Sequence, residues 1–220
     1  MIVLENIWKT YHTPDGNIEA LRDVNLRIEK GEFVTLCGPS GSGKTTLLMI
    51  MAAMLRPTRG KVLVEHSDLY QMSIRDRARF RAQNTGFIFQ MFYLVPYLNV
   101  IENVTLAGGV GQGRIDAARA RELLSQLGLA GREFHKPSQL SAGEKQRAAI
   151  ARALFNRPKI ILADEPTGNL DPENASSVIK CLSEFHQNGG IVIIATHELQ
   201  ARKFASGVIY LREGAIEKHI

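Results

Sequence analysis

The chain has 220 residues, 45% of them hydrophobic, which is enough for one domain with a sizeable buried core. Lys and Arg outnumber Asp and Glu by 27 to 22, a net charge of +5 that fits a phosphate ligand, an anionic membrane face or a nucleic acid. Two cysteines exclude a disulfide framework, and no apolar run approaches the roughly 20 residues that span a bilayer, so we expect a soluble, cytosolic protein.

Short apolar segments alternate with longer segments of helical periodicity. This alternation, with continuous apolar runs in the second half, predicts an α/β fold whose sheet is mostly parallel and buried on both faces. The expected strands are Ile2–Trp8, Leu26–Ile28, Phe33–Cys37, Lys61–Val64, Ile160–Ala163, Ile191–Ala195 and Val208–Leu211. The expected helices are Thr45–Leu55, Ile115–Leu127, Ser141–Phe155 and Pro172–Asn188.

We expect a single domain over residues 1–220. Its core would combine residues 1–90 and 150–220, and the early strands would form a small antiparallel layer. Residues 91–149 are expected to form an inserted, mostly α-helical subdomain. The glycine-rich stretch from Gly108 to Gly113 lacks the strand and the acidic residue of a dinucleotide fingerprint, and is interpreted as a flexible connection between helices.

The segment from Gly38 to Thr46 matches Gly-x-x-x-x-Gly-Lys-Thr, a loop that cradles nucleotide phosphates. A predicted strand precedes it and a predicted helix follows it, as such a loop requires. Its glycines let backbone N–H groups approach an anion, and the helix N-terminus adds its positive dipole end. Lys44 would reach the β- and γ-phosphates, and the Thr45 hydroxyl would hold Mg²⁺. The expected contacts are Ser40, Gly41, Ser42, Gly43, Lys44, Thr45 and Thr46.

Two acids end the predicted buried strand that begins at Ile160. Ligands of parallel sheets bind beyond the carboxyl ends of the strands, so Asp164 is placed to hold Mg²⁺ beside the phosphate loop. Glu165 lies one residue further, where a carboxylate can orient or deprotonate an attacking water. The alternative is a solvated turn after a strand, which the upstream phosphate loop disfavours.

Leu140–Glu144 reads Leu-Ser-Ala-Gly-Glu and opens another predicted helix. Ser141 and Glu144 alone would form a capping box, which starts a helix without any ligand. Together with the preceding motifs, however, the chain resembles the nucleotide-binding subunit of an ABC transporter, a P-loop NTPase whose signature reads Leu-Ser-Gly-Gly-Gln. Ala142 and Glu144 depart from it. The resemblance implies that Ser141 and Gly143 contact the γ-phosphate of an ATP held by the partner subunit.

The resemblance covers nearly the whole chain and implies further roles. It assigns Tyr11 to stacking on adenine, and Gln90, after the strand Gly86–Phe89, to sensing Mg²⁺ and the attacking water. His197 would contact the γ-phosphate, and Gly168–Asp171 would contact the opposite site across a dimer. The implied catalytic residues are Lys44, Gln90, Glu165 and His197, and the implied magnesium ligands are Thr45, Gln90 and Asp164.

Finer features are similar to the lipoprotein-releasing and macrolide-exporting group, in which Glu also occurs at position 144. These are the stretch from Ala163 to Asp171 and the sequence Leu94-Val95-Pro96 after Gln90. The resemblance implies a head-to-tail homodimer that hydrolyses MgATP to power a separate membrane permease, peripheral on the cytoplasmic face of the membrane. The large apolar side chains of Met91–Leu98 suit a groove that receives a partner helix, or the core of the helical subdomain.

Other functions remain to be weighed. A cell-division-type force transmitter or a haem or peptide exporter would carry the same motifs. A nucleic-acid-repair ATPase would place a coiled coil or zinc module between Lys44 and Ser141, which lie too close together here, so no nucleic acid is expected. A translation-type ATPase usually has two such domains, and a small-molecule kinase would leave Ser141–Arg147 and His197 unexplained.

Overall fold

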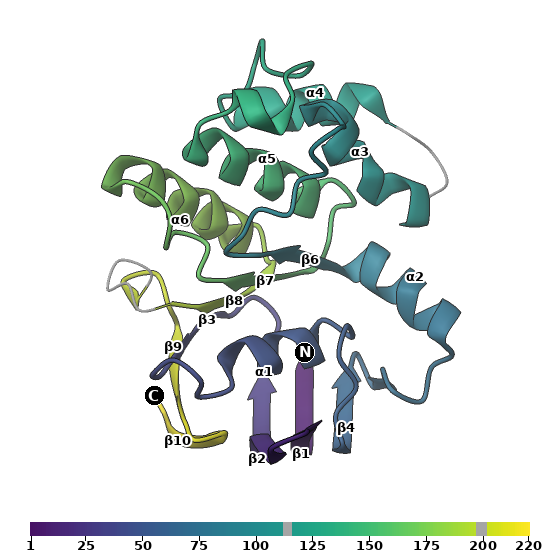
Figure 1. The fold of residues 1–220 in the computed structure, drawn as a ribbon, viewed down its shortest axis with the longest axis vertical. Helices are drawn as coiled ribbons and strands as arrows, with labels where there is room; N and C mark the ends of the chain where they lie inside the picture. Colours follow the sequence, from purple (N-terminus) through teal and green to yellow (C-terminus); the bar gives the residue numbers. More distant parts are fainter. Residues whose placement is uncertain (112–115, 197–201) are drawn as a thin grey trace.

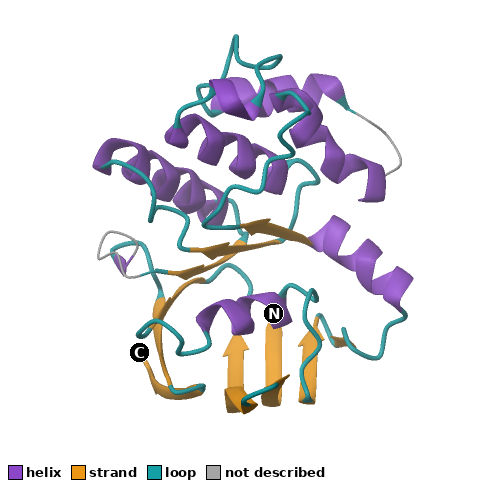
Figure 2. Cartoon of the chain, viewed as in Figure 1, coloured by secondary structure: helices purple, strands orange, loops and turns teal. Residues whose placement is uncertain are grey.

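The computed structural model describes residues 1–111, 116–196 and 202–220, and its chain is arranged in layers (Figure 1). An antiparallel sheet has the strand order β2-β1-β4-β5, and a second sheet has the order β10-β9-β3-β8-β7-β6. Helix α1 lies between the two sheets, and α5 and α6 cover the other side of the second sheet (Figures 1 and 2). The predicted α/β class with an antiparallel N-terminal layer is confirmed.

The antiparallel sheet is larger than predicted. A turn around Pro14 and Asp15 joins β1 to β2, and their pairing extends from Ile2 opposite Ile28 to Thr13 opposite Gly16. The outer halves of both strands are exposed, so their side chains lack the apolar alternation by which a half-buried strand is recognised. Its strands are β1 (Ile2–Thr13), β2 (Gly16–Ile28), β4 (Arg59–Val64) and β5 (Ser67–Asp68).

The second sheet follows the prediction closely. The neighbouring pairs from β9 through β3, β8 and β7 to β6 are parallel, and β10 pairs antiparallel with β9. The continuous apolar runs of β3 and β8 are buried throughout, as strands covered on both faces must be. The strands are β3 (Phe33–Cys37), β6 (Thr85–Ile88), β7 (Ile160–Asp164), β8 (Ile191–Ala195), β9 (Gly207–Arg212) and β10 (Ala215–His219).

The four predicted helices begin and end close to the predicted residues, with local exceptions, whereas α2 and α3 had no predicted bounds. Helix α1 stops at Met51, before the predicted Leu55, and Ala53 adopts a left-handed φ of 56°. Helix α4 begins at Ala117 because the side chain of Asp116 accepts the N–H of Arg119 and caps it. The helices are α1 (Lys44–Met51), α2 (Ile74–Asn84), α3 (Val100–Gly111), α4 (Ala117–Gln126), α5 (Ala142–Leu154) and α6 (Pro172–Gln187), with a 3₁₀ turn at Pro137–Gln139.

The interpretation of the glycine-rich stretch as a connection is wrong for its first half. Helix α3 runs on through Gly111, so the backbone from Gly108 to Gly111 is helical. Glycine costs a helix about 1 kcal/mol relative to alanine but does not forbid it, and the preceding apolar residues of α3 supply packing that outweighs this cost. Among the described residues, no helix combines the length and the apolar character needed to cross a membrane.

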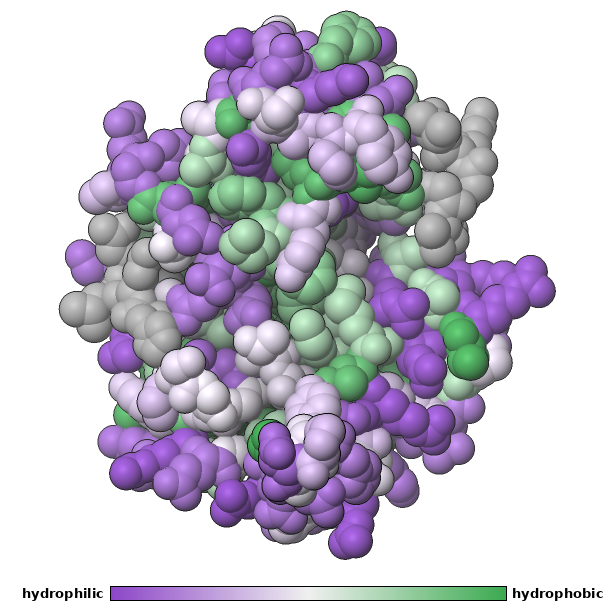
Figure 3. Space-filling model, in the orientation of Figure 1, coloured by the Kyte–Doolittle hydropathy of each residue, from purple (hydrophilic) through white to green (hydrophobic). Residues whose placement is uncertain are grey.

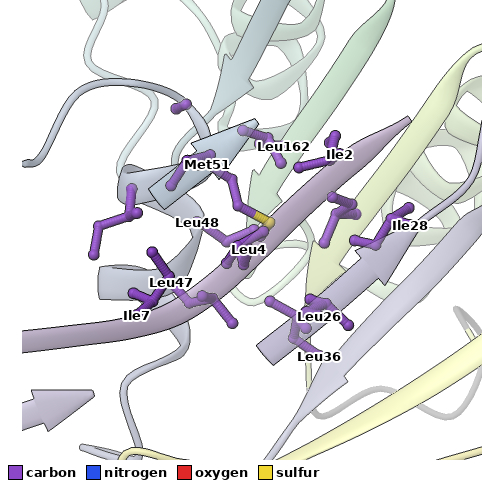
Figure 4. Close-up of a cluster of buried hydrophobic side chains, with 14 of the residues drawn as sticks. Ile2, Leu4, Ile7, Leu26, Ile28, Leu36, Leu47, Leu48, Met51 and Leu162 are labelled. Carbon is purple, nitrogen blue, oxygen red and sulfur yellow. The ribbon is translucent and has the colours of Figure 1, made fainter. Parts of the chain in front are cut away.

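Three hydrophobic clusters hold the layers together. The largest joins α1 to both sheets, and Figure 4 shows Leu47, Leu48 and Met51 of α1 among side chains of β1, β2, β3 and β7. A second fills the space between the second sheet, α5 and α6. A third lies among α3, α4 and α5. Helix α5 contributes to both the second and the third cluster. The predicted division of the chain at residue 149 falls inside this helix, which is therefore shared by the core and the helical subdomain.

Candidate functional site

The phosphate loop connects the buried strand β3 to α1, as its motif predicts. Gly43 immediately precedes the helix with a φ of 103°, a conformation that side chains rarely allow. A Cβ atom there would also collide with the carbonyl oxygen of Ala20 on β2. The glycine is therefore required by the turn and by the close passage of a neighbouring strand, and it presents the N-terminus of α1 toward the loop.

Lys44 folds back across the loop that precedes it. Its Nζ donates to the carbonyl oxygens of Gly38 at 2.8 Å and Pro39 at 2.9 Å, and the residue is largely buried. An ammonium group carries three N–H donors, and two carbonyls do not exhaust them. The ammonium charge is thus fixed over the phosphate loop. A phosphate oxygen bound there would contact both the ammonium group and the backbone amides of the loop.

Asp164, at the end of β7, lies opposite Thr45 in the first turn of α1. The Thr45 hydroxyl donates to Asp164 Oδ2 at 2.8 Å. Burial raises the pKa of the Asp164 carboxyl, whereas the Thr45 hydrogen bond and the Lys44 charge act in the opposite direction. Two adjacent oxygen ligands of an octahedral Mg²⁺ lie about 2.9 Å apart, so the spacing of this oxygen pair fits that ion once the Thr45 hydroxyl proton turns away from Asp164.

Glu165 follows Asp164 in a strained backbone conformation. Its φ is 44°, in the left-handed region, and its N–H donates to the carbonyl of Ala195 at the end of β8 at 2.8 Å. Its own carbonyl accepts the N–H of Gly168 at 3.2 Å. Such strain persists only where surrounding contacts impose it, and it is frequent at functional positions. Here it turns the chain sharply beyond the sheet edge.

Gln90 lies just beyond β6, and the segment that follows Glu165 contacts it. The side chain of Asn169 donates to the Gln90 carbonyl at 3.2 Å. A Cβ atom on Gly168 would lie 3.5 Å from Gln90 Nε2, so the glutamine side chain packs directly against that glycine. The loops after β6 and β7 therefore meet at the edge where the phosphate loop ends.

These groups line one cavity of about 570 Å³. The phosphate loop, the loop after β6 and the loop after β7 each contribute to it. One lining residue, Ala20 on β2, gave no sequence signal because it has neither a functional group nor a motif. The lining residues are Ala20, Ser40, Gly41, Gly43, Lys44, Thr45, Thr46, Gln90, Asp164, Glu165 and Gly168.

Tyr11 projects from β1 at the margin of this cavity. Its hydroxyl lies 3.4 Å from Thr46 Oγ1, and the ammonium of Lys9 lies 5.1 Å from the centre of its ring. The side chain is exposed, so the ring is accessible to a flat ligand next to the phosphate loop. Ser42, in contrast, is buried and does not line the cavity, and its backbone N–H donates to the carbonyl of Pro39 at 3.2 Å.

The start of α5 is separate from the cavity of its own chain. The Ser141 hydroxyl accepts the N–H of Glu144 at 3.2 Å, and Glu144 Oε2 accepts the N–H of Ser141 at 2.8 Å, which completes the expected capping box. Glu144 Oε1 also accepts from Arg132 Nε at 3.0 Å. Ser141 is exposed, whereas Gly143 is buried. His197 lies outside the described residues.

Comparison with known proteins identifies the family. Residues 21–168, more than half of the chain, match the family model described as ABC transporter. The lipoprotein-releasing system ATP-binding protein LolD 2 of Caulobacter vibrioides is 43% identical over 99% of this chain and 96% of its own length. The macrolide export ATP-binding/permease protein MacB of a Shewanella species is 39% identical over 95% of this chain, which spans 32% of that protein.

A solved structure agrees with this relationship. The dimeric, post-hydrolysis structure of the ATP-binding cassette MJ0796 of Methanocaldococcus jannaschii, bound to ADP and Pi, superposes with a TM-score of 0.94. It is 38% identical and covers 100% of this chain and 98% of that one. The resemblance in the motifs is thus confirmed over the whole chain. The chain belongs to the ABC transporter family, as an ATP-binding and ATP-hydrolysing subunit.

Proposed function

We propose that this chain binds MgATP in the cavity at the phosphate loop and that a second copy completes the site with the N-terminus of its α5. The supporting observation is the convergence of Lys44, Thr45, Asp164 and Glu165 on one cavity, while Ser141 is exposed and lies outside it. The N-terminus of a helix favours an anion, and Ser141 and Ala142 at the start of α5 are exposed, so this end of the helix can receive a phosphate from a second copy. A head-to-tail homodimer would supply that ligand twice.

In this proposal the side chains of one copy divide the work of phosphoryl transfer to water. Lys44 and the loop amides neutralise the phosphates, and Thr45, Asp164 and Gln90 hold Mg²⁺, which supplies further charge stabilisation when bound. Glu165 orients and deprotonates the attacking water. Tyr11 stacks on the base. His197, outside the described residues, is proposed to contact the γ-phosphate.

The permease is proposed to dock beside Gln90. A groove of about 500 Å³ lies between α2, β6, α3 and α5, and its apolar walls include Met54, Phe87, Phe89 and Tyr93. Figure 3 shows hydrophobic side chains gathered across the hollowed middle of this face. Arg152 of α5 donates to the backbone carbonyls of Phe92 and Tyr93. These bonds hold in place the segment whose Tyr93 forms part of the groove wall.

Exposure of large apolar side chains supports the same surface. Met91 is 61% exposed, Tyr93 65% and Tyr97 75%, although each would be costly to leave in water. Interfaces are enriched in such aromatic and methionine side chains. A permease helix that filled this groove would contact the segment that directly follows Gln90 in the sequence. Movement of the permease would then be transmitted through Gln90 to the nucleotide.

We further propose a complex of the lipoprotein-releasing or macrolide-export type, on the cytoplasmic face of the membrane. The similarity to LolD 2 over nearly both full lengths supports this subgroup. A cell-division-type force transmitter remains the second candidate. Transport by the reconstituted complex would distinguish the two, because a force transmitter moves no substrate.

The test of the site is oligomeric state by size-exclusion chromatography with light scattering, combined with ATPase assays. Glu165→Gln should lower kcat by about 100-fold or more and should accumulate as a dimer in MgATP, because blocked hydrolysis keeps the bridging nucleotide in place. Lys44→Ala should stay monomeric with and without nucleotide. A Glu165→Gln protein that remains monomeric at saturating MgATP, with and without the permease, would contradict the two-copy site.

A further inference from the structure

One face of α5 is attached to the segment that follows Glu165. Gly143, Gln146 and Arg147 are spaced by three and four residues, so they lie on the same side of the helix. Gln146 is buried, and its Nε2 donates to the carbonyl of Pro166 at 2.7 Å. Arg147 Nη1 donates to Oδ1 of Asn174, in the first turn of α6. Two side chains thus tie α5 to residues 166–174.

Asn174 occupies the centre of this attachment. Its Nδ2 donates to Asp171 Oδ2 at 2.6 Å, and its backbone N–H donates to Asp171 Oδ1 at 3.0 Å. The amide oxygen faces the Arg147 guanidinium and the amide nitrogen faces the Asp171 carboxylate. Rotating the amide by half a turn would oppose donor to donor and acceptor to acceptor, so its position is fixed by two charged partners.

Gly143 is pressed against that amide. A Cβ atom on Gly143 would lie 2.5 Å from Cγ and from Oδ1 of Asn174 and 2.9 Å from its Nδ2. Gly143 has no left-handed φ, so its backbone would accept an alanine, which helices ordinarily prefer to glycine. The three nearest heavy atoms all belong to Asn174. What makes alanine costly at this position is therefore a contact within the same chain.

We propose that Asn174 is a positioning residue that locks the N-terminus of α5 to the segment 168–171, and that position 143 is glycine because Asn174 fills the space beside it. The functional half of this inference rests on the proposed two-copy site, since Ser141 and the segment 168–171 are the parts assigned to the opposite nucleotide. Joined through Asn174, they approach the second copy as one rigid unit rather than as two independent loops.

The first test is a double-mutant cycle on stability and activity. Gly143→Ala should lower the Tm of the nucleotide-free protein by about 4–10 °C, the effect of one overpacked methyl group. In the Asn174→Ala background the same change should cost no Tm, because the methyl enters vacated space. Turnover of the Gly143 variants is recorded alongside and should fall in both backgrounds, because Gly143 belongs to the end of α5 that is proposed to meet the opposite nucleotide. If Gly143→Ala does not fold, recovery of folded protein in the double variant gives the same answer.

The second test separates positioning from general stability. Asn174→Ala should leave the ATP affinity of the monomer unchanged, because the phosphate loop does not contact it, while kcat falls by about tenfold or more through misplacement of the second half-site. In the Glu165→Gln background it should weaken MgATP-dependent dimerisation. Asn188→Ala is the matched control, since Asn188 caps the other end of α6 through Glu184, and it should change neither quantity.

The outcomes separate the two levels of the inference. An equal loss of Tm from Gly143→Ala in both backgrounds would overturn the packing role of Asn174. A normal kcat and normal dimerisation of Asn174→Ala would overturn its positioning role. Failure of the two-copy site itself would appear differently: the Tm cycle would hold, but Glu165→Gln would remain monomeric in MgATP.

Discussion

The cavity at the phosphate loop and the N-terminus of α5 are built in opposite ways. In the cavity, charged side chains from separate loops converge, with Lys44 over the loop carbonyls and Thr45 bonded to Asp164. At the start of α5, the polar groups are satisfied by near neighbours: Ser141 and Glu144 cap each other, and Arg132 pairs with Glu144. The first region is prepared to hold a ligand by itself, whereas the second is a stable surface.

This difference explains how one chain can be stable alone and still depend on a second copy. The capping box satisfies the start of α5 without nucleotide, so an empty half-site does not lower the free energy of unfolding. The monomer therefore folds with that half-site exposed. The dimer then closes only when the nucleotide bound in one copy reaches the exposed start of α5 in the other. Mass action therefore couples dimer formation to MgATP. Variants of the two regions should accordingly fail in different assays.

The largest expected effect separates the regions by nucleotide affinity. Lys44→Ala should weaken ATP binding to the monomer by roughly 30-fold or more, because it removes a positioned charge from the phosphates. Ser141→Ala should leave monomer affinity unchanged and reduce dimerisation and turnover, besides the roughly 1 kcal/mol of stability that loss of the helix cap costs. Isothermal titration of the isolated chain measures the first effect. Equal losses of monomer affinity in both variants would show that the regions are not separate half-sites.

A smaller effect is expected at the margin of the cavity. Tyr11→Ala should weaken ATP and GTP binding together by about tenfold, because stacking uses the face of any purine and reads no hydrogen bonds. Turnover at saturating nucleotide should change little. Titrations with both nucleotides measure this, with Tyr11→Phe as the control that keeps the ring and loses only the hydroxyl near Thr46. Unchanged affinity in Tyr11→Ala would exclude stacking.

The same contrast explains what could be predicted from the sequence. The cavity is formed by motifs at the ends of buried strands. The position of Lys44 followed from the phosphate-loop motif, and those of Asp164 and Glu165 from the rule that ligands bind beyond the carboxyl ends of parallel strands, whereas Gln90 came from the resemblance to the family. The structure brings these four residues to one cavity. Local pattern and local geometry agree there, which is why the sequence could indicate that these residues lie together.

Long-range contacts were not accessible in this way. Asn174 was predicted only as part of a helix. Nothing in the neighbouring sequence indicates that its side chain contacts Arg147 or fills the space beside Gly143. The outer part of the β1–β2 hairpin was missed because its side chains are mostly exposed. The helical backbone at Gly108–Gly111 was missed because a stretch rich in glycine resembles a connection when the packing of the rest of α3 is not known.

A pH-dependent effect is expected at the start of α5. The Ser141 backbone N–H, together with Arg132, holds the pKa of Glu144 below the ordinary glutamate value of 4.5. A lowered pKa in the folded state stabilises the protein fully above pH 4.5, and this contribution disappears as the pH falls through the folded-state value. Glu144→Gln should therefore cost about 1 kcal/mol at pH 7 and progressively less below pH 4.5.

Urea unfolding at several pH values measures this difference. Arg132→Gln provides the control: it should destabilise the parent chain slightly but have no further effect in the Glu144→Gln background, because its partner charge is already gone. A destabilisation by Glu144→Gln that stays constant down to acid pH would show that the carboxylate charge has no part in capping α5.

The smallest effect is expected from restoring a glycine at position 142. Ala142 is exposed, in contrast to Gly143 beside it, so its methyl group presses on nothing in its own chain. If the backbone N–H groups of α5 bind the opposite nucleotide, Ala142→Gly should change turnover by less than about threefold and should lower stability by up to about 1 kcal/mol through glycine's cost in a helix. ATPase assays at saturating MgATP and urea unfolding measure the two quantities. An activation of tenfold or more would show that the Ala142 methyl group crowds the phosphate held by the second copy. Turnover would then be limited by the dimer interface rather than by the Gly143–Asn174 packing.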